Sequence, residues 1–110
     1  MPERYRILGQ IAATANATYN LYTVPASTNT VVSSIIVTNR NNNANITYRI
    51  AVQPGGATLA NDHFIAYDTS VVALDSAALS LGLALGVGDV LSVNTANANV
   101  TFSAFGVEIT

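Results

Sequence analysis

The sequence predicts an all-β fold: one antiparallel β-sandwich of about eight strands, of the Ig-like or jelly-roll type, formed by residues 1–110 as a single domain. Three observations support this prediction. Val, Ile and Thr, which favour strands, dominate the periodic segments. Apolar and polar residues alternate with a period of two, and no window shows the apolar stripe of a long helix. Clusters of Asn, Gly, Pro and Asp recur at intervals of about ten residues, as turns do in sandwiches.

The N-terminal half is expected to contain a first strand, a short strand and a central strand. The first two lie at residues 4–11 and 21–24, with a polar stretch between them. Pro25 ends the second strand because proline cannot donate a hydrogen bond to a strand ladder. Residues 30–39 carry apolar side chains on both faces, which predicts a central strand covered on each side.

A hairpin is expected next. Residues 46–53 alternate regularly between apolar and polar, which is typical of a strand with one buried face. Residues 39–45 contain five Asn and are expected to form a loop, because Asn tolerates turn and left-handed conformations. The strand at 30–39, this loop and the strand at 46–53 therefore predict a hairpin with a long exposed tip.

The C-terminal half completes the sandwich. Further strands are expected at residues 63–68, 77–85, 90–95 and 100–109, with an edge segment at 71–74. In residues 77–85 four Leu are spaced by two, which places them on one face of a strand, whereas a helix would scatter them. The strand order does not follow from this pattern. Residues 1–20 are a candidate N-terminal assembly arm.

The composition excludes several classes of site. The chain has no Cys and one His, which rules out a disulfide scaffold, a Cys nucleophile and a multi-His zinc site. It has no Lys, four Arg and a net charge of −2, so we expect no nucleic-acid partner. No apolar run has the length of a membrane span or an export signal, and we expect neither.

Charged residues make up only 9% of the chain, well below the usual quarter. A free monomer normally carries more surface charge for solubility. Asn, Thr and Ser take the place of charged residues here. This composition favours a subunit packed into an assembly over a monomer with a neutral polar coat.

No constellation of residues predicts catalysis. His63 beside Asp62 has the chemistry of a general base, but no nucleophile-elbow sequence accompanies it, so we expect a surface or strand-start His. The aspartates near strand ends lack the spacing of a calcium loop and are expected to serve turns. We therefore predict no enzyme activity, no catalytic residues, no metal ligands and no cofactor; a small hydrolase is the weakest hypothesis.

Tyrosines and arginines near the predicted edges are the candidates for a subunit interface. Tyr offers a large contact area with a polar tip and is enriched at interfaces. The candidates are Tyr5, Arg6, Tyr19, Tyr22 and Arg40.

Several segments resemble small structural proteins of tailed bacteriophages. They are residues 5–10 (Tyr-Arg-Ile-Leu-Gly-Gln), 21–26 (Leu-Tyr-Thr-Val-Pro-Ala), 38–40, 48–52, 65–68 and 102–109. The resemblance is one of pattern along nearly the whole chain, and none of these segments is a catalytic motif. It implies a virion component of a phage infecting cyanobacteria or other aquatic bacteria, assembled in the host cytoplasm.

Two functions follow as expectations. The first is a capsid decoration or cement protein, a homo-oligomer that contacts other virion proteins, such as the major capsid or tail proteins, through buried interfaces. The second is a tail, baseplate or fibre-attachment protein that binds a receptor or carbohydrate. In the second reading the contact surface is formed by the loop at 39–45 and the turn at 94–99, although these loops contain no aromatic residue.

Overall fold

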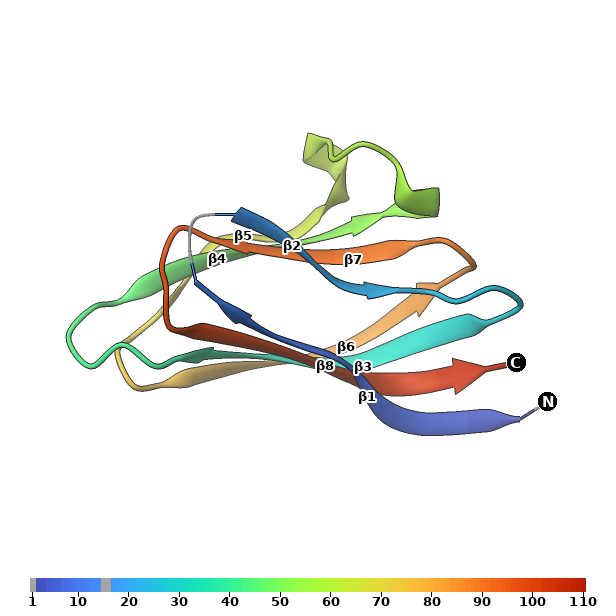
Figure 1. The fold of residues 1–110 in the computed structure, drawn as a ribbon, viewed down its shortest axis with the longest axis horizontal. Helices are drawn as coiled ribbons and strands as arrows, with labels where there is room; N and C mark the ends of the chain where they lie inside the picture. The colour runs from blue at the N-terminus through green and yellow to red at the C-terminus, as the bar shows by residue number, and fades with distance from the viewer. Residues whose placement is uncertain (1, 15–16) are drawn as a thin grey trace.

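The computed structural model describes residues 2–14 and 17–110, which form two packed antiparallel sheets of four strands each (Figure 1). This confirms the predicted eight-strand sandwich. The strands are β1 (Glu3–Ala13), β2 (Ala17–Thr23), β3 (Asn29–Asn39), β4 (Ile46–Gln53), β5 (Phe64–Val71), β6 (Ser76–Leu85), β7 (Val90–Thr95) and β8 (Val100–Ile109). Two short 3-10 turns, η1 (Pro54–Gly56) and η2 (Asn61–His63), lie between β4 and β5.

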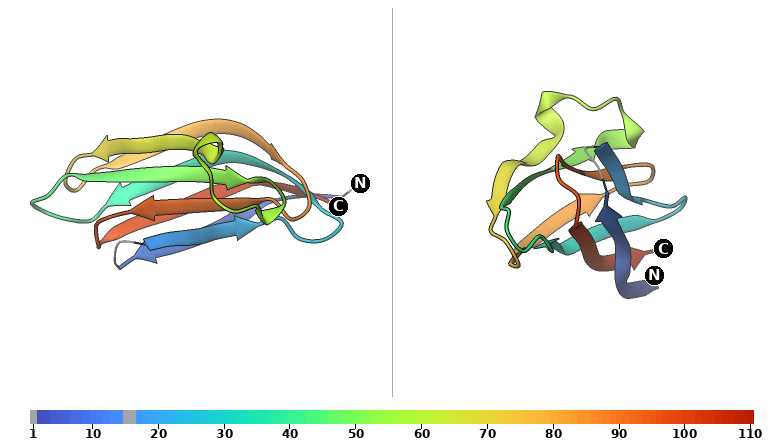
Figure 2. Two further views of the ribbon diagram at one scale, coloured as in Figure 1. Left: turned by 90° about the horizontal axis from the view of Figure 1, so that it is seen from above. Right: turned by 60° about the vertical axis from the view of Figure 1, so that its left-hand side comes forward.

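The strand order is that of a jelly roll. Sheet A has the order β1-β8-β3-β6 and sheet B the order β2-β7-β4-β5, and Figure 2 shows the two layers from further directions. An Ig-like sandwich places its first, second, fourth and fifth strands in one sheet. Here the first and second strands lie in opposite sheets, and each sheet draws strands from both halves of the chain, as in two interleaved Greek keys.

The prediction that residues 30–53 form a hairpin is wrong. β3 pairs with β6 and β8 in sheet A, whereas β4 pairs with β5 and β7 in sheet B. The Asn-rich loop between them therefore crosses from one sheet to the other. The prediction of an edge segment at residues 71–74 is also wrong, because β5 ends at Val71 and the chain then turns into β6.

The N-terminal strands are longer than expected. β1 pairs with β8 from Glu3 to Ala13, and β2 pairs with β7 from Ala17 to Thr23. The candidate arm at residues 1–20 is therefore built into both sheets as far as it is described; residues 1, 15 and 16 lie outside the described residues. Both strands were predicted in part, but the polar residues 17–20 hid the first half of β2, which lies at a sheet edge with much of its surface in solvent.

The core lies between the sheets and is apolar. Its largest fully buried side chains include Tyr48, Phe102, Ile35, Ile46, Ile50 and Leu91. The rings of Tyr48 in sheet B and Phe102 in sheet A meet edge to face, with centroids 6.4 Å apart.

A bulge in β3 decides which of its residues enter the core. The register shifts between Val32 and Ser34 in the pairing with both neighbours. Val32 therefore points inward, and so do Ile35 and Val37 beyond the bulge. Strict alternation therefore does not run through residues 30–39, because Val31 and Ser33 do not share the inward face of Ile35 and Val37. The predicted cover on both sides of this strand is wrong, since Val31 stays only half-buried on the outer face.

Asn39 anchors the crossing between the sheets. Its side chain is fully buried and its amide nitrogen donates to the carbonyls of Ala44 (2.9 Å) and Val71 (3.1 Å). Its side-chain oxygen accepts from the backbone nitrogen of Asn41 (3.0 Å). The first residues of the expected exposed tip are thus held against the sandwich, while Asn42 and Asn43 remain exposed.

One polar cluster is buried where β2 of sheet B faces sheet A. The Tyr22 hydroxyl donates to Oε2 of Glu108 on β8 (2.6 Å) and lies 2.8 Å from the Thr30 hydroxyl on β3. Oε1 of Glu108 accepts from Arg6 on β1 (3.1 Å). Glu108 is almost completely buried, and a buried carboxylate requires such partners. The cluster therefore joins strands of both sheets.

Burial and the hydrogen bond to Glu108 raise the pKa of Tyr22 to about 12. Both causes disfavour the phenolate, since burial withholds water from a charge and the carboxylate repels a second anion. The Tyr22 hydroxyl therefore stays a neutral hydrogen-bond donor across the neutral pH range.

Gly9 allows β1 and β2 to approach each other at the edge of the sandwich. A Cβ atom added at Gly9 would overlap the backbone carbonyl oxygen of Leu21 on β2. Backbone atoms cannot move aside as a flexible side chain can. A side chain here would therefore force the sheets apart.

Gly9→Ala is expected to lower the free energy of unfolding by about 3 kcal/mol, the upper range for overpacking a core. Gly82→Ala is the control, because a Cβ at that exposed strand position meets no atom within 4 Å. Urea unfolding followed by circular dichroism measures both variants. Equal stability of the two would show that the close approach at Gly9 is not a constraint.

Tyr22→Phe is expected to lower the free energy of unfolding by about 2 kcal/mol, because it leaves the buried Glu108 carboxylate without one of its donors. Tyr5→Phe removes a hydroxyl from an 82% exposed side chain and should change stability by less than about 0.5 kcal/mol. Chemical denaturation at neutral pH compares the two. A Tyr22→Phe protein as stable as the Tyr5→Phe control would contradict the bridging role.

The contribution of Tyr22 should also depend on pH. Because its pKa rises from 10.0 in the unfolded chain to about 12 in the folded chain, its contribution is complete below pH 10 and is lost as the pH approaches 12. The stability difference between the parent and Tyr22→Phe should therefore shrink over this range. Burial also raises the pKa of Tyr48, but Tyr48 is present in both proteins, so its contribution to the pH dependence cancels in the difference. A difference that stays constant from pH 9 to 11, measured by urea unfolding, would refute the shift.

Candidate functional site

The five predicted interface residues do not form one surface. Tyr5, at 82% exposure, and Arg6 lie on β1 at the edge of sheet A, and Arg40 is exposed after β3. Tyr19 is half-buried on β2 and packs against the core. Tyr22 is buried in the Glu108 cluster and presents no surface to a partner. An interface role for these residues stays a prediction, with Tyr5 and the two arginines placed where a partner can reach them.

Two of these side chains are already engaged within the chain. Arg6 is paired with Glu108 on the inner side of β1, at 3.1 Å. Nε of Arg40 donates to the Thr101 hydroxyl at 3.0 Å, and this contact holds the guanidinium against the outer face of sheet A.

Sheet A carries an apolar surface on its outer face. Tyr5 and Ile7 on β1 are 82% and 51% exposed. In the sheet register Tyr5 lies opposite Val107, which in turn lies opposite Val31, and Ile7 lies opposite Phe105. We call this surface the apolar patch; it comprises Tyr5, Ile7, Val31, Phe105, Val107 and Ile109. No described element covers it, and Glu3 is the single charged residue of β1 that points to this face.

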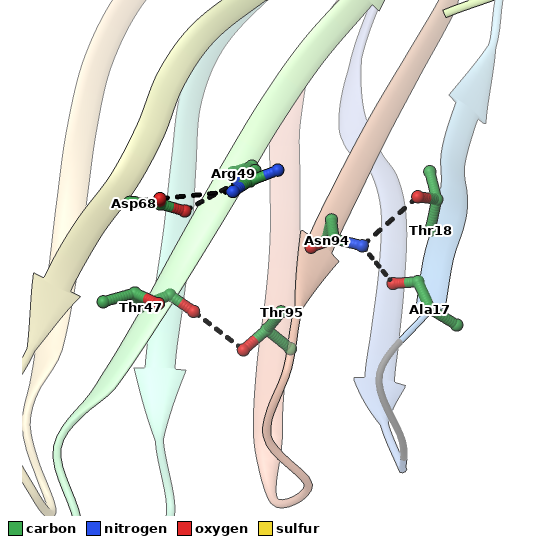
Figure 3. Close-up of polar contacts among 7 residues, drawn as sticks. All are labelled: Ala17, Thr18, Thr47, Arg49, Asp68, Asn94 and Thr95. Atoms are coloured by element: carbon green, nitrogen blue, oxygen red, sulfur yellow. Dashed lines mark hydrogen bonds and ion pairs between the residues drawn. The ribbon is translucent and has the colours of Figure 1, made fainter.

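Sheet B carries a polar hollow on its outer face. The hollow has a volume of about 460 Å³ and is lined by Thr47, Tyr48, Arg49, Asp68, Asn94 and Ala96. Arg49 alternates with the buried Tyr48 and Ile50 along β4, so its side chain points outward. Figure 3 shows Arg49 between Asp68 on β5 and Asn94 on β7.

An ion pair forms one wall of this hollow. Nε and one terminal nitrogen of Arg49 donate to the two carboxylate oxygens of Asp68, at 2.7 and 3.2 Å. Hydrogen bonds from Arg49 lower the pKa of Asp68, and the same bonds raise the pKa of Arg49. Both groups therefore stay charged across the neutral range, and together they carry no net charge.

Aromatic residues support the pair. The Arg49 guanidinium carbon lies 3.9 Å from the centroid of the Tyr67 ring, in cation–π geometry. The Phe64 ring meets Tyr67 edge to face, with centroids 5.0 Å apart. Tyr67 itself is 56% exposed.

Asn94 fixes the opposite wall. Its amide nitrogen donates to the carbonyl oxygen of Ala17 (2.9 Å) and to the hydroxyl of Thr18 (3.2 Å), both on β2. The Thr95 hydroxyl donates to the Thr47 carbonyl (2.8 Å) and joins β7 to β4 beneath the hollow (Figure 3).

The other side chains considered for catalysis or metal binding, His63 and Asp89, accept hydrogen bonds from backbone nitrogens in turns. Nδ1 of His63 accepts from the backbone nitrogen of Ala60 (3.1 Å) in η2, and Nε2 lies 3.7 Å from the exposed Asp62. The Asp89 carboxylate accepts from the backbone nitrogens of Gly55 and Gly86, both at 2.8 Å. Within residues 2–14 and 17–110 no three His, Cys, Asp or Glu side chains gather as metal ligands. The same residues contain no helix long and apolar enough to cross a membrane.

Sequence reasoning found only parts of the two surfaces: Tyr5 of the apolar patch, and Asn94 and Ala96 of the hollow, within the turn at 94–99. The alternation of Tyr5 with Ile7, and of Phe105 with Val107 and Ile109, was visible, but it did not show which face of each strand would meet the other sheet. Arg49 and Asp68 are 19 residues apart and meet only because β4 pairs with β5. The positive φ of 53° at Asp68, where β5 departs from regular pairing, is likewise not readable from the sequence.

Comparisons with known proteins identify the fold and no family. No family model matches the sequence, and no curated protein does. Among solved structures, the chain is similar to part of a chain in the crystal structure of the T13 viral particle of infectious bursal disease virus (TM-score 0.53, 11% identity). The match covers 96% of this chain and 30% of that one.

Structures of the Gx and Gt strains of the same virus also match, each with a TM-score of 0.49 and identities of 10% and 11%. These matches cover 97% and 96% of this chain and 31% and 32% of the viral chains. The chain thus spans about a third of the length of the proteins it resembles. At this identity the likeness concerns the fold alone: this chain shares its jelly-roll architecture with one part of a protein of an icosahedral virus particle.

Proposed function

We propose that this chain is a non-enzymatic structural subunit of a virion, most specifically a decoration or cement protein on the head of a tailed bacteriophage. It acts as a homo-oligomer that also contacts other virion proteins. Its mechanism is the burial of interface area, which holds neighbouring subunits together without any chemical reaction.

The apolar patch is the observation that carries this proposal. Three adjacent strands, β1, β8 and β3, present Tyr5, Ile7, Val107 and their neighbours side by side on an uncovered face. Apolar surfaces of this kind on soluble proteins mark contacts with other proteins. Tyr, the residue type of the most exposed member of the patch, is enriched at interfaces.

Surface charge supports the same role. With 9% charged residues, the chain offers few groups that need to stay in water when a face is covered. The absence of Lys is consistent with partners that are proteins and not nucleic acid. The shared fold with part of a virus-particle protein is compatible with this use of a jelly roll.

The edge strands suggest how neighbours join. β1 and β6 are the edges of sheet A, and an unpaired edge offers backbone donors and acceptors to a second chain. Because the apolar patch begins at the β1 edge, one partner covers both the face and the edge. Covering the edge also suppresses uncontrolled strand pairing.

A tail, baseplate or fibre-attachment protein with a receptor- or carbohydrate-binding role is the second candidate. The polar hollow on sheet B favours it, since this hollow faces away from the apolar patch and includes Asn94 and Ala96 of the expected contact turn. The apolar patch would serve as an interface at either position on the particle, head or tail.

Electron microscopy of purified phage particles with a gold-labelled antibody to this chain tests the proposal. Gold distributed over the head supports a decoration or cement protein. Gold confined to the tail or its tip supports the second candidate. Particles without gold, in a preparation whose other structural proteins are detected, contradict both.

Ile7→Glu is expected to abolish oligomer formation and particle binding while leaving the fold intact, because Ile7 is 51% exposed in the single chain. A buried, unpaired carboxylate in the interface should weaken association by at least about 3 kcal/mol, or more than a hundredfold. Analytical ultracentrifugation and cosedimentation with particles measure the effect.

Val87→Glu is the matched control, since Val87 is 56% exposed in the turn after β6 and is not a member of the apolar patch. It should assemble and bind as the parent does. Deleting residues 1–10 is a poor test, because it removes most of β1 from its ladder with β8. If Ile7→Glu associates as strongly as Val87→Glu, the apolar patch is not the interface.

A further inference from the structure

We propose that the polar hollow on sheet B binds a neutral carbohydrate, with Arg49, Asp68 and Asn94 contacting its hydroxyl groups. This inference rests on the second candidate function and names its site and ligand class, and it does not depend on the apolar patch, which lies on the other sheet. It assigns a ligand to the outer face of sheet B.

The hollow has the size of a ligand site. Its volume of about 460 Å³ lies within the range of small-molecule sites. Three neighbouring strands, β5, β4 and β7, supply most of its walls, and Ala96 in the turn after β7 supplies the rest (Figure 3). Sites built on strands hold their side chains more precisely than sites on loops.

The walls offer both donors and acceptors. A guanidinium has five N–H groups, and Arg49 uses two of them on Asp68, which leaves three for a ligand. Within residues 2–14 and 17–110 the side-chain oxygen of Asn94 accepts no hydrogen bond, because its contacts run through the amide nitrogen to β2. The Thr47 hydroxyl can both donate and accept. A sugar hydroxyl, which also does both, matches this mixture.

The charge of the site selects a neutral ligand. Arg49 is already compensated by Asp68, so the hollow has no surplus positive charge for a phosphate or carboxylate. Asp68 is its one carboxylate, which is too few for a cation site. Polar groups line most of the hollow, which disfavours an apolar ligand. A polyhydroxylated, uncharged molecule remains.

The polar groups are held in place before a ligand arrives. The planar Arg49–Asp68 pair is bidentate, and the Tyr67 ring supports the guanidinium from 3.9 Å. Asn94 is fixed by two donated hydrogen bonds to β2. Little side-chain freedom is therefore lost on binding, which favours affinity.

The test is an NMR titration of the ¹⁵N-labelled chain with glucose, galactose, mannose and N-acetylglucosamine, each added separately. We expect at least one sugar to shift the resonances of Thr47, Arg49, Asp68 and Asn94 in a saturable way. Saturable shifts confined to other residues, or no saturable shift with any of the four sugars, would overturn the proposal. Stronger binding of inorganic phosphate or sialic acid at these residues would overturn the assignment of an uncharged ligand.

Two conservative variants test the residues, with the sugar that gives the largest shift. Arg49→Lys keeps the positive charge and loses the planar fork. Asp68→Asn keeps a residue that tolerates the positive φ at this position and removes the charge. Each should weaken binding about tenfold, the effect of losing one hydrogen bond to a charged group.

Arg40→Ala is the control, because Arg40 is exposed but contacts the outer face of sheet A. It should bind as the parent does. The exposed Arg49–Asp68 pair contributes little to stability, so both variants should keep the dispersed spectrum of the folded chain. Unchanged affinity in both variants, with the fold retained, would refute the assignment of the site.

Discussion

The two sheets of this protein are held in one relative position by the buried carboxylate of Glu108. Hydrophobic burial drives the sheets together but has no direction. The hydrogen bonds of Glu108 with Tyr22 and Arg6 are directional, and they connect β8 and β1 of sheet A to β2 of sheet B. A buried charge tolerates few arrangements of its partners, so this cluster selects one alignment of the sheets from those that the apolar core would accept.

That alignment leaves two outer faces of different chemistry. Sheet A presents the apolar patch, in which Tyr5 and Ile7 are the most exposed members. Sheet B presents the hollow with the Arg49–Asp68 pair, whose charges cancel. Together the proposals describe a subunit that is held to its neighbours by one face and displays the other. Because both sites are carried on strands, neither requires the fold to move in order to bind.

The accuracy of the sequence predictions varied along the chain for physical reasons. β7 and β8 have the predicted bounds, 90–95 and 100–109, because each begins and ends at a clear turn. β3 and β4 were assigned correctly as strands but wrongly as a hairpin, because alternation reports burial and not the partner. The bulge near Ser33 changes the inward face of β3, and no turn residue marks it. Of the five interface candidates, Tyr22 shows how a side chain suited to an interface can instead serve the core.

By itself the sequence determined the fold class, most strand positions and the scarcity of charge, because periodicity and composition are properties of neighbouring residues. Only the tertiary structure decided between the Ig-like and jelly-roll orders, and only it brought together the apolar patch, the hollow and the Glu108 cluster. Tyr22 and Glu108 are 86 residues apart, and Arg49 and Asp68 are 19 apart. Such pairs are set by which strands lie side by side, and strand pairing in a sandwich is a choice among distant partners that local pattern does not encode.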